Sequence, residues 1–314
     1  MKVAVLDDYG LVAKKLNIWD QLHNSFEISF FDHPQPVNVL AQFECLIGIR
    51  ERTIFNKHLL SQLPELKHLA LTGRVSAQAD LEYARQNGIA VSFTRGSGRA
   101  PSEHAIALIM AASKSIVGNH NGMLSGKWQN APSYSLENKT LGILGLGRIG
   151  KTVAVFGKLM GMNVISAGIN QESKNAQELQ IARVSLEDLF ASSDILSIHL
   201  KLSPQTTGLV NETLLDKMKP NALLVNTARA KIIDMPAMYK KINSGRIRVA
   251  LDVFEEEPFM VQDIPALYRE NVLLSPHMGY VTEEVYHSFF IEVIENLNNW
   301  LHNRAYRSAL TVKE

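Results

Sequence analysis

A glycine-rich turn that follows a short apolar run constrains this chain more than any other feature of its sequence. The stretch is Leu141–Gly150, with the sequence LGILGLGRIG. Gly145 permits a tight turn out of a strand, Gly147 lets the backbone approach a pyrophosphate, and Gly150 lets the next helix lie close to the strand. The anion would lie on the helix N-terminus, which the helix dipole makes positive. Alone, the pattern also occurs as plain structure and in S-adenosylmethionine and flavin proteins.

Composition and charge describe an ordinary globular protein. A chain of 314 residues is long for one hydrophobic core, so we expect two domains. The hydrophobic fraction of 46% and the charged fraction of 20% are typical of folded soluble proteins. The formal net charge is +1 and there is no dense run of Lys and Arg. Nucleic acid and anionic membranes are therefore not expected as partners.

The sequence favours a cytoplasmic protein. Met1–Asp8 (MKVAVLDD) resembles a first strand that ends in acids, and it is too short and too charged for a signal sequence. No apolar run approaches the length that crosses a bilayer. Cys45 is the only cysteine and lies in an apolar run, so we expect a buried strand thiol rather than a nucleophile.

The first hundred residues alternate short β-rich runs with helix-period stretches. The pattern predicts a small, flavodoxin-like parallel sheet covered on both faces. The predicted strands are Val3–Leu6, Glu27–Phe31, Leu46–Ile49, Leu69–Leu71 and Ala90–Phe93. The predicted helices are Ala13–Leu22, Asn56–Leu63 and Leu81–Gln86.

A domain boundary is predicted at the glycine-rich bend Arg95–Pro101 (RGSGRAP), because Pro101 would begin the next helix. That helix should run from about Ser102 to Val117. The following stretch, Gly118–Glu137, is polar and predicted to be an irregular arm. We expect a partner subunit to cover this arm, which would make the protein a homodimer.

A second alternation of strands and helices begins at the glycine turn. The predicted strands are Lys139–Gly145, Asn163–Ser166, Ile195–His199, Ala222–Asn226, Val249–Asp252 and Val272–Leu274. Six such strands make a Rossmann-type doubly wound parallel sheet, which gathers ligands at the carboxyl ends of its strands. Thr282–His302 predicts a Thr-capped helix that returns to the first domain. The predicted α/β domains are therefore 1–97 with 281–314, and 98–280.

Several reactive side chains follow predicted strands of the second sheet. Arg229, Asp252 with Glu257, and His277 each come after a strand. Taken singly, a strand-end Arg is usually a surface group, a lone His is usually structural, and an acidic run is usually a solvated loop. Together, beside a nucleotide turn, they predict a reactive site.

Five successive signatures resemble those of the D-isomer-specific 2-hydroxyacid dehydrogenase family. They are Gly145–Gly150 (GLGRIG), Asp194–His199 (DILSIH), Val225–Arg229 (VNTAR), Ala250–Pro258 (ALDVFEEEP) and Ser275–His277 (SPH). The resemblance implies an NAD(P)-dependent oxidoreductase that interconverts a D-2-hydroxy acid and its 2-oxo acid by hydride transfer. It also implies that the substrate lies in a cleft between a nucleotide domain and a substrate domain.

The resemblance implies roles for individual residues. Arg229 would grip the substrate carboxylate, which suits its planar fork. His277 would be the general acid/base and Glu257 its carboxylate partner. The implied cofactor contacts are Gly145, Gly147, Arg148, Ile149, Gly150, Gly168, Asn170, His199, Thr227 and Asp252, the last at the nicotinamide carboxamide. The implied substrate contacts are Arg74, Val75 and Ser76 together with Arg229 and His277, and no metal is implied.

The sequence departs from the family pattern at three points. Gly168 stands where an acid usually accepts from the ribose hydroxyls of NAD, and Asn170 could bond a hydroxyl or a phosphate. The cofactor is therefore NAD or NADP, and we favour NADP. Ala230 replaces the usual Gly after the arginine, and the loop containing Arg74 lacks the usual glycine-rich form. A nucleotide-sensing, corepressor-like binding protein and a formate- or phosphite-type dehydrogenase remain the alternatives.

Overall fold

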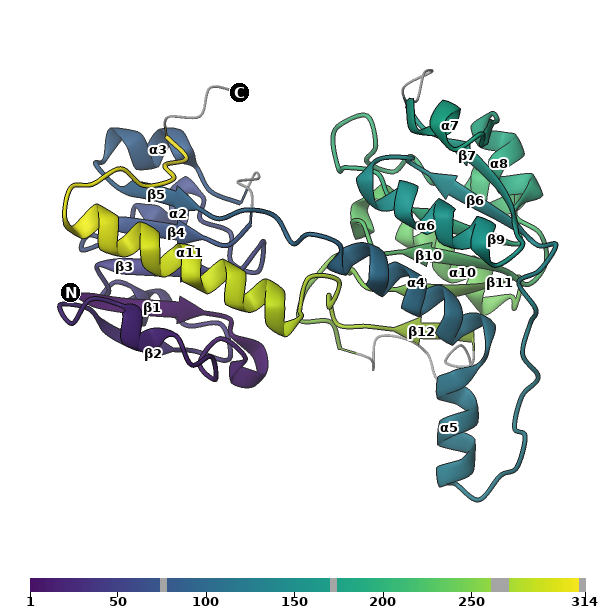
Figure 1. Cartoon of the computed structure of the whole chain (residues 1–314), viewed down its shortest axis with the longest axis horizontal. Coiled ribbons are helices and arrows are strands. Elements are labelled where there is room, and N and C mark those ends of the chain that lie inside the picture. The colour runs from purple at the N-terminus through teal and green to yellow at the C-terminus, as the bar shows by residue number, and fades with distance from the viewer. Residues whose placement is uncertain (74–77, 170–173, 261–270, 311–314) are drawn as a thin grey trace. The chain divides into compact units, whose positions relative to one another are not determined.

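The chain folds into two compact α/β units, each built around its own parallel sheet (Figure 1). The computed structural model describes residues 1–73, 78–169, 174–260 and 271–310. The first unit comprises Met1–Gly98 and Val281–Glu314, and the second comprises Arg99–Tyr280. The predicted fold class, a doubly wound sheet with a smaller flavodoxin-like sheet, is confirmed.

The first unit contains a five-stranded sheet in the order β2-β1-β3-β4-β5, with every pair parallel. This is the flavodoxin-like strand order. The strands are β1 (Lys2–Leu6), β2 (Glu27–Phe30), β3 (Cys45–Gly48), β4 (His68–Leu71) and β5 (Ala90–Phe93). β3 and β4 are buried throughout because both faces of the sheet are covered. Burial raises the pKa of the Cys45 thiol to about 12, so this cysteine is an inert core residue.

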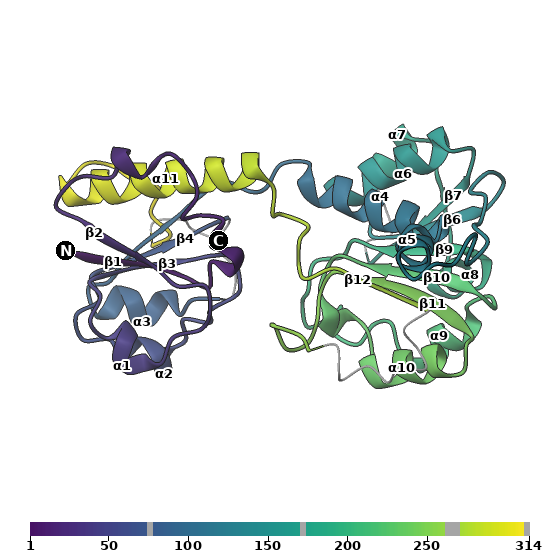
Figure 2. The same ribbon diagram turned by 90° about the horizontal axis from the view of Figure 1, so that it is seen from below.

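Helices cover both faces of this sheet. Figure 2 shows α1 (Val37–Leu40), α2 (Lys57–Leu60) and α3 (Leu81–Gln86) on one face and α11 (Glu283–Leu301) on the other. The predicted Thr cap of α11 is confirmed, because the Thr282 hydroxyl accepts from Val285 N at 3.3 Å. α11 contacts β4 and β5, so the C-terminal helix does return to the first unit.

The predicted helix over Ala13–Leu22 is wrong. Within that segment the only helical element is a short 3₁₀ turn at Trp19–Gln21, and a second 3₁₀ turn, Tyr9–Leu11, precedes it. The buried Asp8 carboxylate accepts from the backbone N–H of Ala13 and Lys14 at 2.9 and 3.0 Å. These bonds hold the backbone in a tight local turn, which competes with a continuous helix.

The second unit contains a seven-stranded sheet in the order β12-β11-β10-β9-β6-β7-β8, again with every pair parallel. Its strands are β6 (Thr140–Leu144), β7 (Asn163–Ala167), β8 (Ala182–Arg183), β9 (Ile195–Ile198), β10 (Ala222–Asn226), β11 (Ile247–Leu251) and β12 (Val272–Leu274). The six predicted strands are present in Rossmann order. Strand β8 was missed because two residues are too few to show an alternating pattern.

Helices also cover both faces of the larger sheet (Figure 2). One layer contains α4 (Ala100–Ser113), α6 (Arg148–Leu159) and α7 (Lys174–Glu178); the other contains α8 (Leu186–Ser192), α9 (Glu212–Lys217) and α10 (Met235–Asn243). Successive residues of β6 face opposite layers, since Ile143 packs in one apolar core and Leu144 in the other. Among the described helices, none combines the length and the apolar character needed to span a membrane.

The helix predicted over 102–117 is broken, and the arm after it is partly helical. α4 ends at Ser113, Ser115 adopts a left-handed conformation with φ of 49°, and α5 then runs over Ile116–Leu124. The Asn119 side chain stabilises α5 from outside, because its amide donates to Ala131 O at 3.0 Å and its carbonyl accepts from Ala131 N at 3.0 Å. The prediction of an irregular arm is therefore wrong for residues 118–124.

Candidate active site

Six strands of the larger sheet end at residues that pair with one another across the sheet, and we call these six residues the strand-end row. In sheet order, this row consists of Ala167, Leu144, Ile198, Asn226, Leu251 and Leu274. The next residues along the chain are, in the same order, Gly168, Gly145, His199, Thr227, Asp252 and Ser275. Five of these six were predicted from the sequence as cofactor contacts. The structure thus brings them to a single edge, although up to 107 residues of chain separate them.

The glycine turn has the backbone that the sequence predicted. Gly145 has φ of +99°, and a Cβ there would lie 2.8 Å from the carbonyl oxygen of His199. A Cβ at Gly150 would lie 2.2 Å from the carbonyl oxygen of Gly145, so α6 can approach its strand only with glycine at this position. At Gly147, the N-cap of α6, no described atom lies within 4 Å of a built Cβ. The backbone of the first turn, which begins at Arg148 and Ile149, is therefore open to an anion.

Gly168, which stands where the family usually has an acidic residue, has room for a side chain. The nearest described atom to a Cβ built on Gly168 is Gly145 Cα, at 3.9 Å. Gly168 therefore lies beside the glycine turn, where a ribose of a bound dinucleotide would come. Its predicted neighbour Asn170 lies outside the described residues, as do the predicted substrate contacts Arg74, Val75 and Ser76.

His199 is a neutral, half-buried imidazole. Its Nε2 lies 2.9 Å from Ser197 Oγ, and its backbone N donates to Leu144 O at 2.8 Å. Burial lowers the pKa of His199 to about 4. The side chain is therefore uncharged at neutral pH, which agrees with its interpretation as a cofactor-side residue and not as the proton donor.

Asn226 fixes the turn that carries Arg229. The Asn226 amide donates to Arg229 O at 3.0 Å, and its carbonyl oxygen accepts from Ala228 N at 3.0 Å. The Arg229 guanidinium donates to Ala228 O at 2.6 Å. Ala230, which the sequence marked as a departure, is buried in the apolar core with Ile232. The extra methyl group is thus accommodated by core packing.

His277 and Glu257 form a hydrogen-bonded pair. His277 Nδ1 lies 2.7 Å from Glu257 Oε2, and the other carboxylate oxygen of Glu257 accepts from Phe254 N at 3.0 Å. The His277 and Tyr280 rings are arranged edge to face, with centroids 5.4 Å apart. Arg229 and His277 follow β10 and β12, the two strands that flank β11, so the three predicted catalytic residues lie at one edge of the sheet.

Asp252 is a buried carboxylate with several protein donors. It accepts from the Ser275 hydroxyl at 2.6 Å, from Met278 N at 2.7 Å, and from Gly279 N at 3.0 Å, while His104 Nε2 lies 3.1 Å away. Burial acts to raise the pKa of Asp252, but the hydrogen bonds from His104 and Ser275 outweigh burial, and the pKa lies below its ordinary value. The carboxylate is ionised at neutral pH.

The sequence reasoning missed His104 and Ser275. Ser275 was quoted only as the first residue of the motif that contains His277, although its place directly after β12 could have identified it. His104 had no such signal, because 148 residues separate it from Asp252 in the chain. Only the packing of α4 against β10 and β11 brings its imidazole to the strand-end row.

The first unit presents a polar cluster at the carboxyl edge of its own sheet, which sequence reasoning also missed. Arg50 follows β3, and its backbone N donates to the Thr72 hydroxyl at 3.0 Å. A Cβ on Gly73 would lie 1.8 Å from Arg50 Nη1, so the guanidinium lies directly against the glycine. Gly73 is the residue that precedes the predicted substrate contacts.

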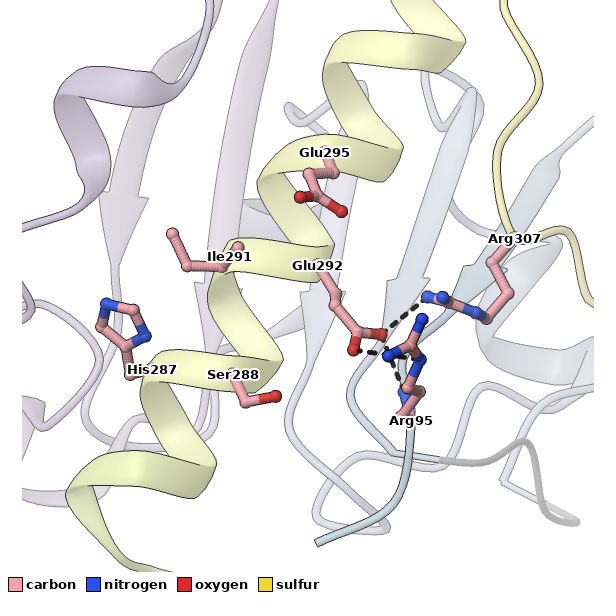
Figure 3. A pocket seen from close by; sticks show the side chains of 7 residues that line it. All are labelled: Arg95, His287, Ser288, Ile291, Glu292, Glu295 and Arg307. Carbon is pink, nitrogen blue, oxygen red and sulfur yellow. Dashed lines mark hydrogen bonds and ion pairs between the residues drawn. The ribbon is translucent and has the colours of Figure 1, made fainter.

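A cavity of about 380 Å³ in the first unit is lined by Arg95, His287, Ser288, Ile291, Glu292, Glu295 and Arg307. Figure 3 shows the carboxylate of Glu292 facing both arginines. Its carboxylate accepts from Arg95 N at 2.9 Å and from Arg307 Nη1 at 2.6 Å. Glu292 therefore neutralises positive charge in this cavity and ties α11 to the segment after β5. Within the described ranges, no group of three or more His, Cys, Asp or Glu side chains is placed to hold a metal ion.

Comparison with known proteins agrees with this geometry. Residues 106–279 match the sequence profile described as D-isomer specific 2-hydroxyacid dehydrogenase, NAD binding domain. The chain belongs to this family, as the sequence resemblance implied. It is an oxidoreductase that uses a nicotinamide cofactor to interconvert a D-2-hydroxy acid and its 2-oxo acid.

Three relatives illustrate the match. Glyoxylate reductase of Aeropyrum pernix is 39% identical over 250 residues, which cover 76% of this chain and 74% of the relative. The crystal structure of a phosphoglycerate oxidoreductase from Vibrio cholerae O395 has a TM-score of 0.91 and 36% identity, covering 96% of this chain and 99% of that one. The apo-structure of D-lactate dehydrogenase from Escherichia coli has a TM-score of 0.85 and 26% identity, covering 98% and 100%.

Proposed function

We propose that the unit Arg99–Tyr280 binds NAD(P) along the strand-end row and that Arg229, Glu257 and His277 carry the reaction. The single observation that carries this proposal is the row itself, which sets the glycine turn and the strand ends bearing these side chains on one edge. The residues fit a dinucleotide because Gly147 leaves the first turn of α6 open. We assign substrate binding to the unit formed by 1–98 and 281–314.

The bound nicotinamide supplies or accepts the hydride. In the reductive direction, Arg229 holds the carboxylate of the 2-oxo acid in a two-pronged hydrogen bond. Protonated His277 donates to the 2-oxo oxygen, where negative charge develops. Because Glu257 accepts from Nδ1, the proton on Nε2 is the one available for donation. Glu257 then keeps the neutral imidazole in the tautomer that can be reprotonated on Nε2.

The remaining predicted cofactor residues divide by their place in the row. We propose that Gly145, Gly147 and the first turn at Arg148–Gly150 hold the pyrophosphate. His199 and Thr227, which follow β9 and β10, would line the nicotinamide side. A contact between Asp252 and the carboxamide stays a prediction, because the side chain is about 1% exposed and already bonded to protein donors.

The substrate is proposed to be a small 2-oxo acid. The relatives above are named for glyoxylate, phosphoglycerate and lactate, and all of these enzymes handle 2-oxo or 2-hydroxy carboxylates. A panel of 2-oxo acids, together with formate and phosphite, should be assayed with NADH and NADPH. Reduction of at least one 2-oxo acid is expected. Oxidation of formate or phosphite alone, or tight cofactor binding without any turnover, would support the two alternative functions instead.

We propose that the cofactor is NADP, on the basis of the glycine at position 168. In the variant Gly168→Asp, the new carboxylate would repel a 2′-phosphate and accept from ribose hydroxyls. The ratio of kcat/KM with NADPH to kcat/KM with NADH should fall by about tenfold or more, since like charges brought together cost several kcal/mol. The matched control is Gly168→Asn, which has the same size without the charge. A wild-type ratio below one would contradict the NADP proposal.

We propose that a second copy of the chain covers the arm, which would make the protein a homodimer. Met123, Leu124 and Trp128 are 61, 76 and 79% exposed, and apolar groups gathered on a projecting segment mark an interaction surface. Replacing Leu124 and Trp128 together with Asp should convert a dimer into a monomer in analytical ultracentrifugation. Ile54→Asp, which alters an exposed residue of the other unit, should leave the dimer intact. A wild-type monomer would refute the proposal.

A further inference from the structure

His104 is joined by hydrogen bonds to the loop that carries His277. It lies in the second turn of α4, and its Nε2 is 2.8 Å from Ser275 Oγ and 3.1 Å from Asp252 Oδ1. Ser275 Oγ is 2.6 Å from the same oxygen of Asp252. Side chains from α4, from the end of β11 and from the end of β12 therefore share one cluster.

The positions of the protons fix the direction of these bonds. The ionised Asp252 carboxylate can only accept hydrogen bonds, so the Ser275 hydroxyl must donate its hydrogen to it. Because this hydrogen is directed at Asp252, Ser275 Oγ can only accept a hydrogen bond from His104. His104 must therefore carry a proton on Nε2, which it donates to Ser275 Oγ and Asp252 Oδ1.

Asp252 in turn holds the backbone that follows His277. Its two oxygens accept from Met278 N at 2.7 Å and from Gly279 N at 3.0 Å. A Cβ on Gly279 would lie 3.1 Å from Asp252 Oδ2, so the loop packs closely on the carboxylate. A shift of the carboxylate would therefore shift the loop.

The backbone of His277 requires such support. Its φ is +54°, in the left-handed region that costs a residue with a side chain roughly 1–2 kcal/mol. Such a conformation persists where the surrounding structure holds it. From this backbone the imidazole reaches Glu257, with 2.7 Å between Nδ1 and Oε2.

We propose that His104 is a positioning residue for the hydride-transfer reaction. Through Ser275 and Asp252 it holds the loop of His277 in the left-handed conformation that aims the imidazole. The inference rests on the role proposed above for His277. His104 itself acts through the other two side chains, so it differs from a catalytic residue.

The test compares two substitutions of His104. His104→Leu removes the N–H donor, whereas His104→Gln keeps one at a similar reach. We expect His104→Leu to lower kcat by roughly 10- to 100-fold, because a misplacement of about 1 Å can cost about 10²-fold. KM for NAD(P)H should stay within about twofold, and His104→Gln should recover most of the activity. Glu103→Gln, an exposed neighbour on the same helix, is the control.

A direct readout separates positioning from catalysis. The NMR signals of the Met278 and Gly279 amides report their bonds to Asp252, and both should move in His104→Leu and in Ser275→Ala but not in Glu103→Gln. If His104→Leu does not fold, the same measurements are made on Ser275→Ala instead. Unmoved amides together with kcat within about twofold of wild type would overturn the inference. If the amide signals move in His104→Leu but its turnover is unchanged, and turnover is also unchanged in His277→Ala, the catalytic role of His277 is overturned instead.

Discussion

Replacing His277 with Ala should lower kcat for 2-oxo acid reduction by about 10² to 10⁴-fold, the usual contribution of a positioned general acid. The imidazole is the group paired with Glu257 at 2.7 Å, and without it the developing alkoxide receives no proton from the protein. The affinity for NADH and NADPH should stay within about twofold, because the glycine turn lies at the end of β6, four strands away in the sheet. Steady-state kinetics and calorimetric titration of the cofactor measure the two quantities.

Two further variants make the His277 result specific. Glu257→Gln keeps a hydrogen-bond acceptor but loses the charge that stabilises the imidazolium, so its kcat should fall less than that of His277→Ala. His58→Ala removes an exposed histidine of the first unit and should leave kcat unchanged. If kcat of His277→Ala stays within about threefold of wild type, His277 is not the general acid and the assigned site is wrong.

Replacing Arg229 with Lys should lower kcat/KM for the 2-oxo acid by about 10- to 10²-fold. Lysine keeps the positive charge, but it cannot form two parallel bonds to a carboxylate. Loss of one hydrogen bond to a charged group costs about 1.5–3 kcal/mol, which corresponds to this range. Asn226 fixes the backbone of position 229 through Arg229 O and Ala228 N, so the turn should survive the substitution.

The kinetic pattern of Arg229→Lys shows what the arginine does. A rise in KM alone would mean that the guanidinium binds substrate and transition state equally, whereas a fall in kcat as well would mean that it also polarises the 2-oxo group. Arg85→Lys, which alters an exposed side chain of α3, is the matched control and should behave as wild type. A kcat/KM for Arg229→Lys close to that of wild type would exclude Arg229 as the carboxylate ligand.

Local patterns predicted much of the fold and several candidate site residues. The glycine turn could be recognised in the sequence because the backbone at Gly145 and Gly150 leaves no space for a side chain, so only glycine fits at these positions. Arg229 and His277 could be placed because each follows a short apolar run that could only be a buried strand. These features depend on neighbouring residues, so sequence reasoning reaches them.

The failures share a physical cause, which is a contact that no local pattern reports. The helix expected at Ala13–Leu22 does not form, because the buried carboxylate of Asp8 binds the backbone there. Helix α5 extends into the arm, where the contact between Asn119 and Ala131 stabilises it. In the first case an apolar periodicity and in the second a polar composition was interpreted without the polar bond that decided the outcome. Burial of a polar side chain depends on the whole fold and cannot be read from its immediate neighbours.

Short-range stereochemistry and the order of the motifs were enough to identify the turns, the buried strands and the family from the residues alone. The three-dimensional fold was needed to align the ends of six strands on one row, since this alignment depends on the hydrogen-bond register between distant segments. It alone also brought His104 to Asp252 across 148 residues. Neither arrangement leaves a periodic trace in the chain.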